Sequence, residues 1–135
     1  MKTTNRKPPK PSEAELEILH ALWTMGPATV RQVHEQLSET KQAQYTTTLK
    51  QLQVMAEKGL VERDESERSH VYRAAVERQL VQRQMASHVL ERVFGGSARG
   101  MLMEMLGAKR TTKKELAELR QILEDHEKAQ KGDRR

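Results

Sequence analysis

Hydrophobic residues in the first half of the chain recur every three or four positions in three successive segments. This spacing predicts three amphipathic helices, at about residues 12–25, 29–38 and 44–58. The first two segments open on a capping-box pattern, in which a serine or threonine is followed three residues later by Glu or Gln. The apolar positions expected to share a core are Leu16, Ile18, Leu19, Leu22, Trp23, Val30, Val33, Leu37, Leu49, Leu52, Met55 and Ala56.

Behind the third predicted helix, the pattern changes from helical to alternating. Gly59 is the expected helix stop, residues 60–63 alternate as a strand and residues 64–69 are all polar. Residues 70–74 then form a returning strand, in which we expect Val71 to face the core. Three helices followed by a hairpin with a polar tip are typical of a winged helix-turn-helix, in which the hairpin is the wing.

The last third of the chain contains three more amphipathic segments. They cover about residues 79–94, 97–106 and 112–126, with glycines at 95, 96 and 107 as the expected stops. Short helices of this kind have too little core to be stable alone, so we expect them to pack against a second copy of the chain. The expected dimerisation residues are Leu80, Met85, Val89, Phe94, Met101, Leu102, Met105, Leu116, Leu119, Ile122 and Leu123.

The first turns of the third helix carry side chains that suit contact with double-stranded DNA. Gln and Thr donate and accept hydrogen bonds at base edges, and Lys and Tyr hold backbone phosphates. In the predicted wing, Arg68 is placed to enter a minor groove or to bind phosphate. The candidate DNA-binding residues are Lys41, Gln42, Gln44, Tyr45, Thr46, Thr47, Lys50, Gln51 and Arg68.

Two alternatives remain open for these residues. Thr46 and Thr47 could instead be helix-capping residues, and the wing charges could be ordinary turn solvation. Net charge alone does not decide between DNA binding and these alternatives, because residues 12–75 hold seven basic and ten acidic residues, a net charge of −3. Residues 41–50 nevertheless contain two lysines and no carboxylate. Pairing two copies on a palindromic site would also double the number of phosphates bound.

Composition excludes several other classes of protein. The chain has 135 residues, a net charge of +5 and no cysteine, so it forms no disulfide and has no thiolate nucleophile or thiolate metal site. No catalytic motif is present, and the five histidines are scattered. The methionines at helical spacing near residues 101–105 indicate packing rather than metal binding. We therefore expect no enzyme activity, cofactor or metal site. Without a long apolar run or a signal-peptide pattern, we expect a cytoplasmic protein with no membrane insertion.

The predicted fold is mainly α. An N-terminal winged helix-turn-helix with a small β-hairpin wing is followed by a helical C-terminal dimerisation region. We expect a flexible basic tail at residues 1–11, a winged-helix DNA-binding domain at 12–75, the dimerisation region at 76–126 and a polar tail at 127–135.

Several short segments in this order resemble the penicillinase repressor family, which includes BlaI, MecI and the copper-responsive CopY repressors. The resemblance covers roughly residues 12–122 and implies a homodimeric winged-helix repressor that occupies a palindromic operator until an inducing signal removes it. The matching segments are Glu15-Leu-Glu-Ile-Leu-His-Ala-Leu-Trp23, Thr29-Val30 with Val33, Tyr45-Thr-Thr47, Lys58-Gly-Leu-Val61, Val71-Tyr-Arg73, Phe94-Gly-Gly-Ser97 and Glu115-Leu-Ala-Glu-Leu-Arg120.

The chain departs from that family at positions that bear on induction. Its β-lactam-responsive members are cleaved at an Asn-Phe bond, where this chain has Glu104-Met105. The copper-responsive members use a cysteine pattern that is absent here. Lys50 stands where the family often has Thr, and Val54 where it often has Arg, which would alter operator preference.

The resulting hypothesis is a sequence-specific transcriptional repressor of antibiotic-resistance or cell-envelope stress genes, with a membrane sensor-protease as a partner. A winged-helix module that binds a protein instead of DNA is the alternative.

Overall fold

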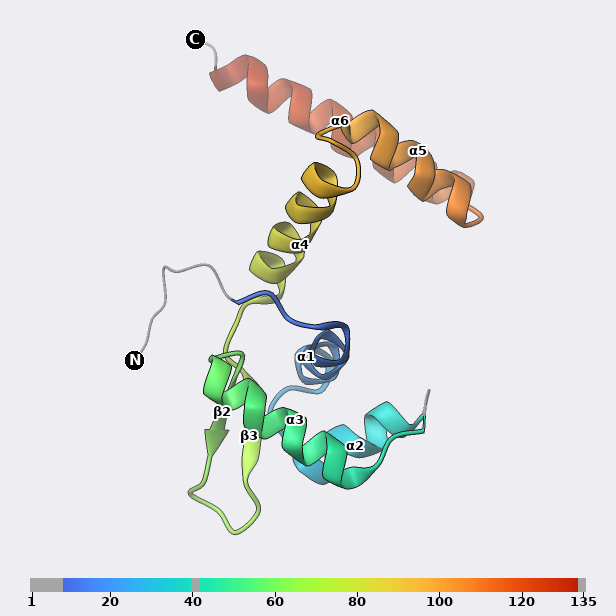
Figure 1. The fold of residues 1–135 in the computed structure, drawn as a ribbon. Helices are drawn as coiled ribbons and strands as arrows, with labels where there is room; N and C mark the ends of the chain where they lie inside the picture. The colour runs from blue at the N-terminus through green and yellow to red at the C-terminus, as the bar shows by residue number, and fades with distance from the viewer. Residues whose placement is uncertain (1–8, 40–41, 134–135) are drawn as a thin grey trace. The chain divides into compact units, whose positions relative to one another are not determined.

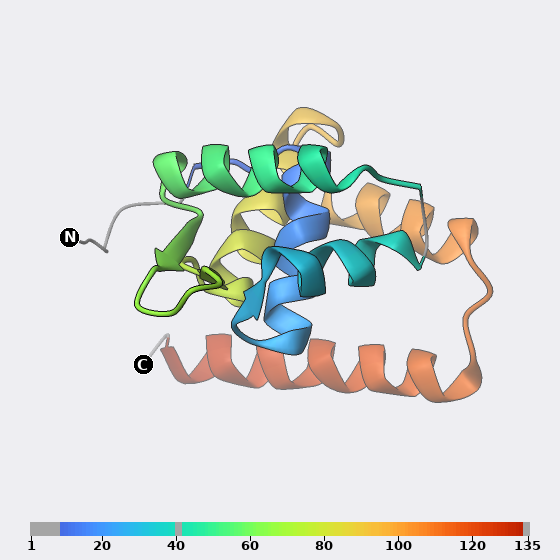
Figure 2. The same ribbon diagram turned by 90° about the horizontal axis from the view of Figure 1, so that it is seen from below.

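The structure is a computed structural model that describes residues 9–39 and 42–133. The chain divides into two compact units, Met1–His88 and Val89–Arg135. The first contains helices α1 (Glu13–Met25), α2 (Val30–Ser38) and α3 (Tyr45–Lys58) and a three-stranded sheet (Figures 1 and 2). The expected basic tail and polar tail lie partly outside the described residues, and Lys41 lies wholly outside them.

Local sequence signals set the ends of the first three helices as expected. Ser12 and Glu15 form a capping box at the start of α1, and Thr29 and Gln32 form another at the start of α2. Gly59 ends α3 in the left-handed conformation, with φ 85°, which only glycine adopts without strain. These three predictions are confirmed.

The sheet has the antiparallel order β1-β3-β2, formed by Ala28–Thr29, Val71–Ala74 and Val61–Asp64 respectively. The hairpin β2-β3 was expected, but the two-residue strand β1 was not. The prediction that Val71 faces the core is wrong, because Tyr72 is the residue buried there, with 1% of its surface exposed. Paired residues share a face of a sheet, and Tyr72 lies opposite Ala28, whereas Val71 lies opposite Asp64.

One hydrophobic core holds the first unit together. Its fully buried side chains come from all three helices and from the sheet, and the partly buried Trp23, Leu49 and Ala56 pack at its edge. The first residues of α4 (Arg78–Arg92) also belong to this unit. Val81 is 1% exposed, and the Trp23 indole donates a hydrogen bond to the Val76 carbonyl oxygen at 3.1 Å. The first unit therefore extends beyond residue 75, where the winged-helix domain was expected to end.

The second unit contains the end of α4, then α5 (Ala98–Ala108) and α6 (Lys113–Asp133). Gly95 and Gly96, with φ 58° and 85°, end α4 as expected. Helix α5 continues through Gly107, and α6 continues through the region expected to be a polar tail. Those residues are polar, but no proline interrupts them, and a hydrogen bond between Gln130 Nε2 and His126 Nε2, at 3.1 Å, links successive turns there.

No side chain from Val89 to Gly132 is buried in a single chain. Val93, Met103, Met105, Ile122 and Leu123 each expose more than half of their surface. Among the described residues, no helix has the length and apolar character to cross a membrane.

Candidate nucleic-acid interface

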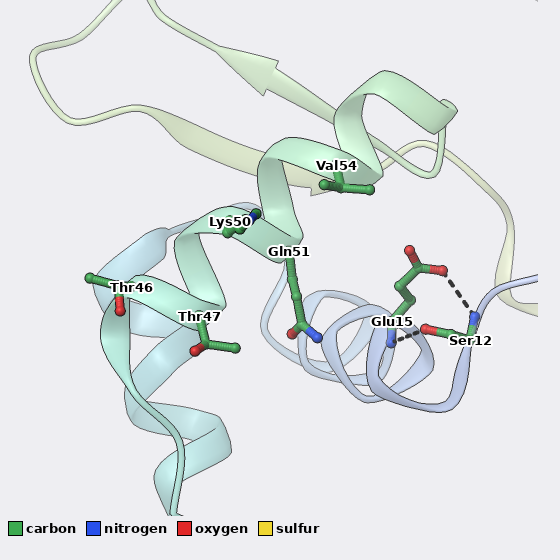
Figure 3. Close-up of a pocket in the computed structure, with 7 residues that line it drawn as sticks. All are labelled: Ser12, Glu15, Thr46, Thr47, Lys50, Gln51 and Val54. Carbon is green, nitrogen blue, oxygen red and sulfur yellow. Dashed lines mark hydrogen bonds between the residues drawn. The ribbon is translucent and has the colours of Figure 1, made fainter.

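Helix α3 has one buried and one exposed side. Thr48, Leu52 and Met55 are buried against the core, whereas Thr46, Thr47 and Lys50 are exposed and Gln51 is half-buried. The four polar residues line a hollow of about 390 Å³ between α3 and the start of α1, as Figure 3 shows. Its remaining lining residues are Ser12, Glu15 and Val54.

A second hollow, of about 280 Å³, lies next to the first. It shares Thr47 and Gln51 and adds Gln42 and Gln44, so the structure brings six of the nine candidate residues to neighbouring surfaces. The six are Gln42, Gln44, Thr46, Thr47, Lys50 and Gln51. Residues 42–56 contain no carboxylate, so Lys50 gives this stretch of chain a positive charge. The α3 side of the two hollows is therefore rich in hydrogen-bonding groups that suit an anionic polymer, whereas α1 contributes Glu15 to the first hollow and Glu17 to the second.

Tyr45, the first residue of α3, is turned toward α2 instead. Its ring meets the His34 ring edge-on, with centroids 5.6 Å apart and planes at 76°, and 40% of its surface remains exposed. It can contact a ligand only beside α2, not from within the two hollows.

A polar contact that sequence analysis missed joins α2 to α3. The buried Thr48 hydroxyl donates to the Gln44 carbonyl oxygen at 3.5 Å, and its oxygen lies 3.3 Å from His34 Nδ1. The Thr48 hydroxyl group thus bridges the Gln44 backbone and the His34 ring. Thr48 and Gln44 thus hold the first turn of α3, which has no side-chain cap. The run of three threonines gave no signal that the third would be buried.

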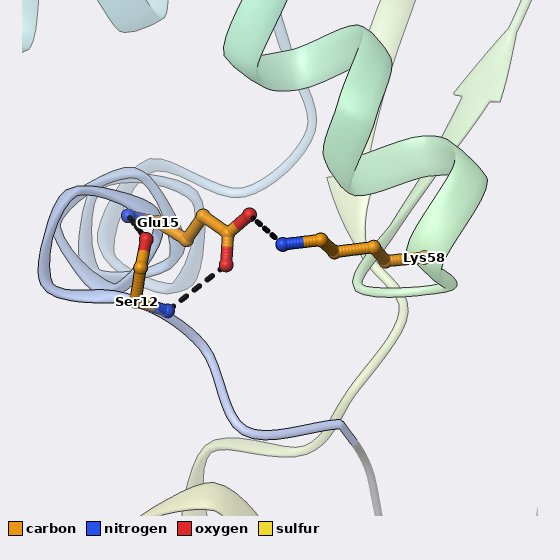
Figure 4. Close-up of polar contacts among 3 residues, drawn as sticks. All are labelled: Ser12, Glu15 and Lys58. Atoms are coloured by element: carbon orange, nitrogen blue, oxygen red, sulfur yellow. Dashed lines mark hydrogen bonds and ion pairs between the residues drawn. The ribbon is translucent and has the colours of Figure 1, made fainter.

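An ion pair holds the other end of α3 against α1 (Figure 4). Glu15, which caps α1 through its hydrogen bond from the Ser12 amide at 2.9 Å, also accepts a hydrogen bond from Lys58 Nζ at 2.7 Å. Burial would raise the pKa of the Glu15 carboxyl, but Lys58 and the two hydrogen bonds with Ser12 together hold the pKa below its usual value. Glu15 therefore stays ionised and fixes the position of α3 on α1.

The wing is less suited to phosphate than the sequence suggested. Residues 61–74 hold four carboxylates and three arginines, a net charge of −1. Arg63 and Arg73 are each within 3.1 Å of a carboxylate, from Glu65 and Glu62 respectively. Arg68, at the exposed tip, is the one wing arginine with no ion pair in the described part of the chain. It is thus the wing cation that is available to a ligand.

Within the described residues, no group of three or more His, Asp or Glu side chains could hold a metal ion. Between residues 42 and 51 the surface offers hydrogen-bonding side chains and the Lys50 ammonium.

Comparison with known proteins gives the chain a family. The family described as Penicillinase repressor matches residues 11–125. The Penicillinase repressor of Bacillus licheniformis is 26% identical over 126 residues, which is 93% of this chain and 98% of that protein. The Transcriptional regulator BlaI of Mycobacterium tuberculosis is 41% identical over 59 residues, 43% of each chain.

Solved structures of the same group are also similar. The Bacillus licheniformis BlaI monomer in complex with the blaP half-operator is 26% identical, with a TM-score of 0.49, over 55% of this chain and 90% of that one. The DNA-binding domain of the repressor BlaI is 25% identical, with a TM-score of 0.49, over 56% and 92%. Because the family match spans most of the sequence, the chain belongs to the penicillinase repressor family.

Proposed function

We propose that this chain is a DNA-binding transcriptional repressor, not an enzyme, and that α3 is its recognition helix. Membership of the penicillinase repressor family supports the class of function, and the match to the Bacillus licheniformis repressor spans nearly the whole of that protein. The observation that carries the site is the exposed side of α3 from Thr46 to Gln51, which contains no carboxylate and belongs to a helix that is held at both ends.

Each polar residue on that side has a role that follows from its chemistry. Thr47 and Gln51 lie in both hollows, so they are central to the surface, and we infer that they contact base edges in the major groove. Lys50 binds a phosphate and sets the register of the helix on the duplex. Gln42, Gln44 and Thr46 contact bases or phosphates at the rim, and Arg68 binds phosphate from the wing. We propose the same for Lys41, which lies outside the described residues.

We further propose that the second unit makes the chain a homodimer. Its lack of any buried side chain between Val89 and Gly132 supports this, because Val93, Met103, Met105, Ile122 and Leu123 stay more than half exposed unless a partner covers them. A second copy would cover the expected dimerisation residues, including Leu80 and Met85 on the part of α4 that belongs to the first unit, and present two recognition helices to a palindromic operator. Substituting Ile122 by Lys should dissociate the dimer in sedimentation experiments, whereas Gln121→Lys, on the neighbouring exposed position, should not.

The finer biological setting is also a proposal. We infer a cytoplasmic regulator of antibiotic-resistance or cell-envelope stress genes, with a membrane sensor-protease as the partner that relieves repression. The residues Glu104 and Met105 lie on exposed turns of α5, so a protease acting there would need a bond preference other than Asn-Phe.

DNA binding measured over a range of salt concentrations tests the proposed function. Binding through phosphates releases counterions, so affinity for a duplex should fall steeply as salt rises. Lys50→Ala should flatten that dependence by about 0.9 in the log–log slope for each phosphate that is no longer neutralised. An affinity that does not change with salt would exclude this account and favour a protein-binding winged helix.

A further inference from the structure

An arginine outside the predicted set of DNA-binding residues lies beside the first turn of α3. Arg31 is the second residue of α2 and is exposed. Its guanidinium carbon lies 5.7 Å from the centroid of the Tyr45 ring. None of the ion pairs among the described residues involves Arg31, so its charge is not neutralised by a carboxylate.

The ring under this guanidinium is itself held in place. Arg31 and His34 lie three residues apart on α2, so they share a face of the helix. Both contact the Tyr45 ring, Arg31 through the guanidinium and His34 edge-on at 5.6 Å. The Tyr45 ring therefore lies across one turn of α2, between the two helices.

His34 connects this arrangement to the core. Its Nδ1 is hydrogen-bonded to the buried Thr48 hydroxyl at 3.3 Å, and its Nε2 lies 3.5 Å from Ser38 Oγ. Thr48 is 1% exposed. A continuous series of contacts thus runs from a buried hydroxyl through an imidazole and a phenol ring to an exposed guanidinium. Each member restricts the rotamers of the next, so the arginine is positioned before any ligand arrives.

We propose that Arg31 binds a backbone phosphate of the DNA that α3 contacts, and that Tyr45 and His34 are the residues that position it. The proposal rests on the proposed function and extends the same surface by one phosphate-binding residue. The contact with the ring uses no N–H group as a hydrogen-bond donor to a carboxylate, so the N–H groups of Arg31 stay available to phosphate oxygens. Phosphate accepts two parallel hydrogen bonds from that edge, which fixes the orientation of the duplex.

The test compares four proteins on a labelled duplex of mixed sequence, with binding followed by fluorescence anisotropy over a range of salt. Arg31→Gln should weaken binding and reduce the log–log salt slope by about 0.9 if Arg31 neutralises one phosphate. Arg31→Lys should keep most of the slope, because the charge remains, while still weakening binding since lysine cannot form the two parallel hydrogen bonds. The matched control is Arg78→Gln, since Arg78 makes a similar contact with Trp23, at 6.0 Å, and lines neither of the two hollows. It should bind as the parent does.

Coupling between the arginine and the ring gives a second readout. If Tyr45 positions Arg31, then Tyr45→Leu and Arg31→Gln together should weaken binding by less than the product of their separate effects. A salt slope for Arg31→Gln equal to that of the parent would overturn the proposal and leave the proposed function intact. A parent protein that fails to bind duplex DNA at any salt concentration would instead overturn the proposed function.

Discussion

The ion pair between Glu15 and Lys58 should be a measurable part of the stability of the first unit. The carboxylate is buried, with 7% of its side chain exposed, whereas the Lys58 side chain is 47% exposed. A hydrogen bond between charged groups contributes about 1.5–3 kcal/mol. Because the Lys58 ammonium can return to water, we expect Glu15→Gln to lower the free energy of unfolding by about 1–2 kcal/mol. Glutamine keeps the capping interaction with Ser12, so the change isolates the pair.

Urea unfolding followed by the fluorescence of Trp23, the single tryptophan, measures this change. The control is Glu13→Gln, an exposed position on the same turn of α1, which should change stability by less than about 0.5 kcal/mol. Protein concentration must be matched, because the proposed dimerisation would contribute to apparent stability. An unchanged urea midpoint for Glu15→Gln at neutral pH would refute the assignment.

The pH dependence gives an independent check with a defined sign. The pKa of Glu15 is lower in the folded protein than its usual value of 4.5, so the unfolded chain takes up the proton first. The stabilisation by the ionised carboxylate is therefore complete above about pH 4.5 and is lost as pH falls through the folded-state pKa. The difference between Glu15→Gln and the parent should shrink over the same interval. A difference that stays constant down to acidic pH would contradict this origin.

Three further predictions concern binding and the fold. Thr47→Ala should reduce the free-energy difference between specific and non-specific DNA binding by about 1–3 kcal/mol for each contacted base. Competition with mixed-sequence DNA measures this difference, and an unchanged ratio of the two affinities would show that Thr47 contacts no base. Arg68→Gln should reduce the salt slope of DNA binding, whereas Arg73→Gln should not, since Arg73 is paired with a carboxylate. Equal slopes in the two variants would exclude the proposed contact between the wing and phosphate. Gly59→Ala should lower the free energy of unfolding by about 1 kcal/mol, because φ is 85° at this position. Urea unfolding measures the change, and an unchanged free energy would mean that the turn relaxes to accept alanine.

The sequence determined the features that depend on neighbouring residues. Capping boxes, a glycine with positive φ and hydrophobic spacing act within a few positions, so the limits of α1, α2 and α3 and the hairpin were predicted to within one or two residues. The exposed side of α3 followed from the same spacing, because a helix that buries Leu52 and Met55 turns Thr46, Thr47 and Lys50 away from the core.

Only the tertiary structure decided which distant residues meet. Glu15 and Lys58 are 43 positions apart, and nothing local marks them as a pair. Likewise, the pairing of Tyr72 with Ala28, not the alternation within β3, placed Tyr72 in the core. The packing of α2 on α3 placed His34 and Arg31 beside Tyr45. Sequence periodicity specifies which face of an element is apolar, but the partner of that face is set by how the elements pack, which is a property of the whole chain.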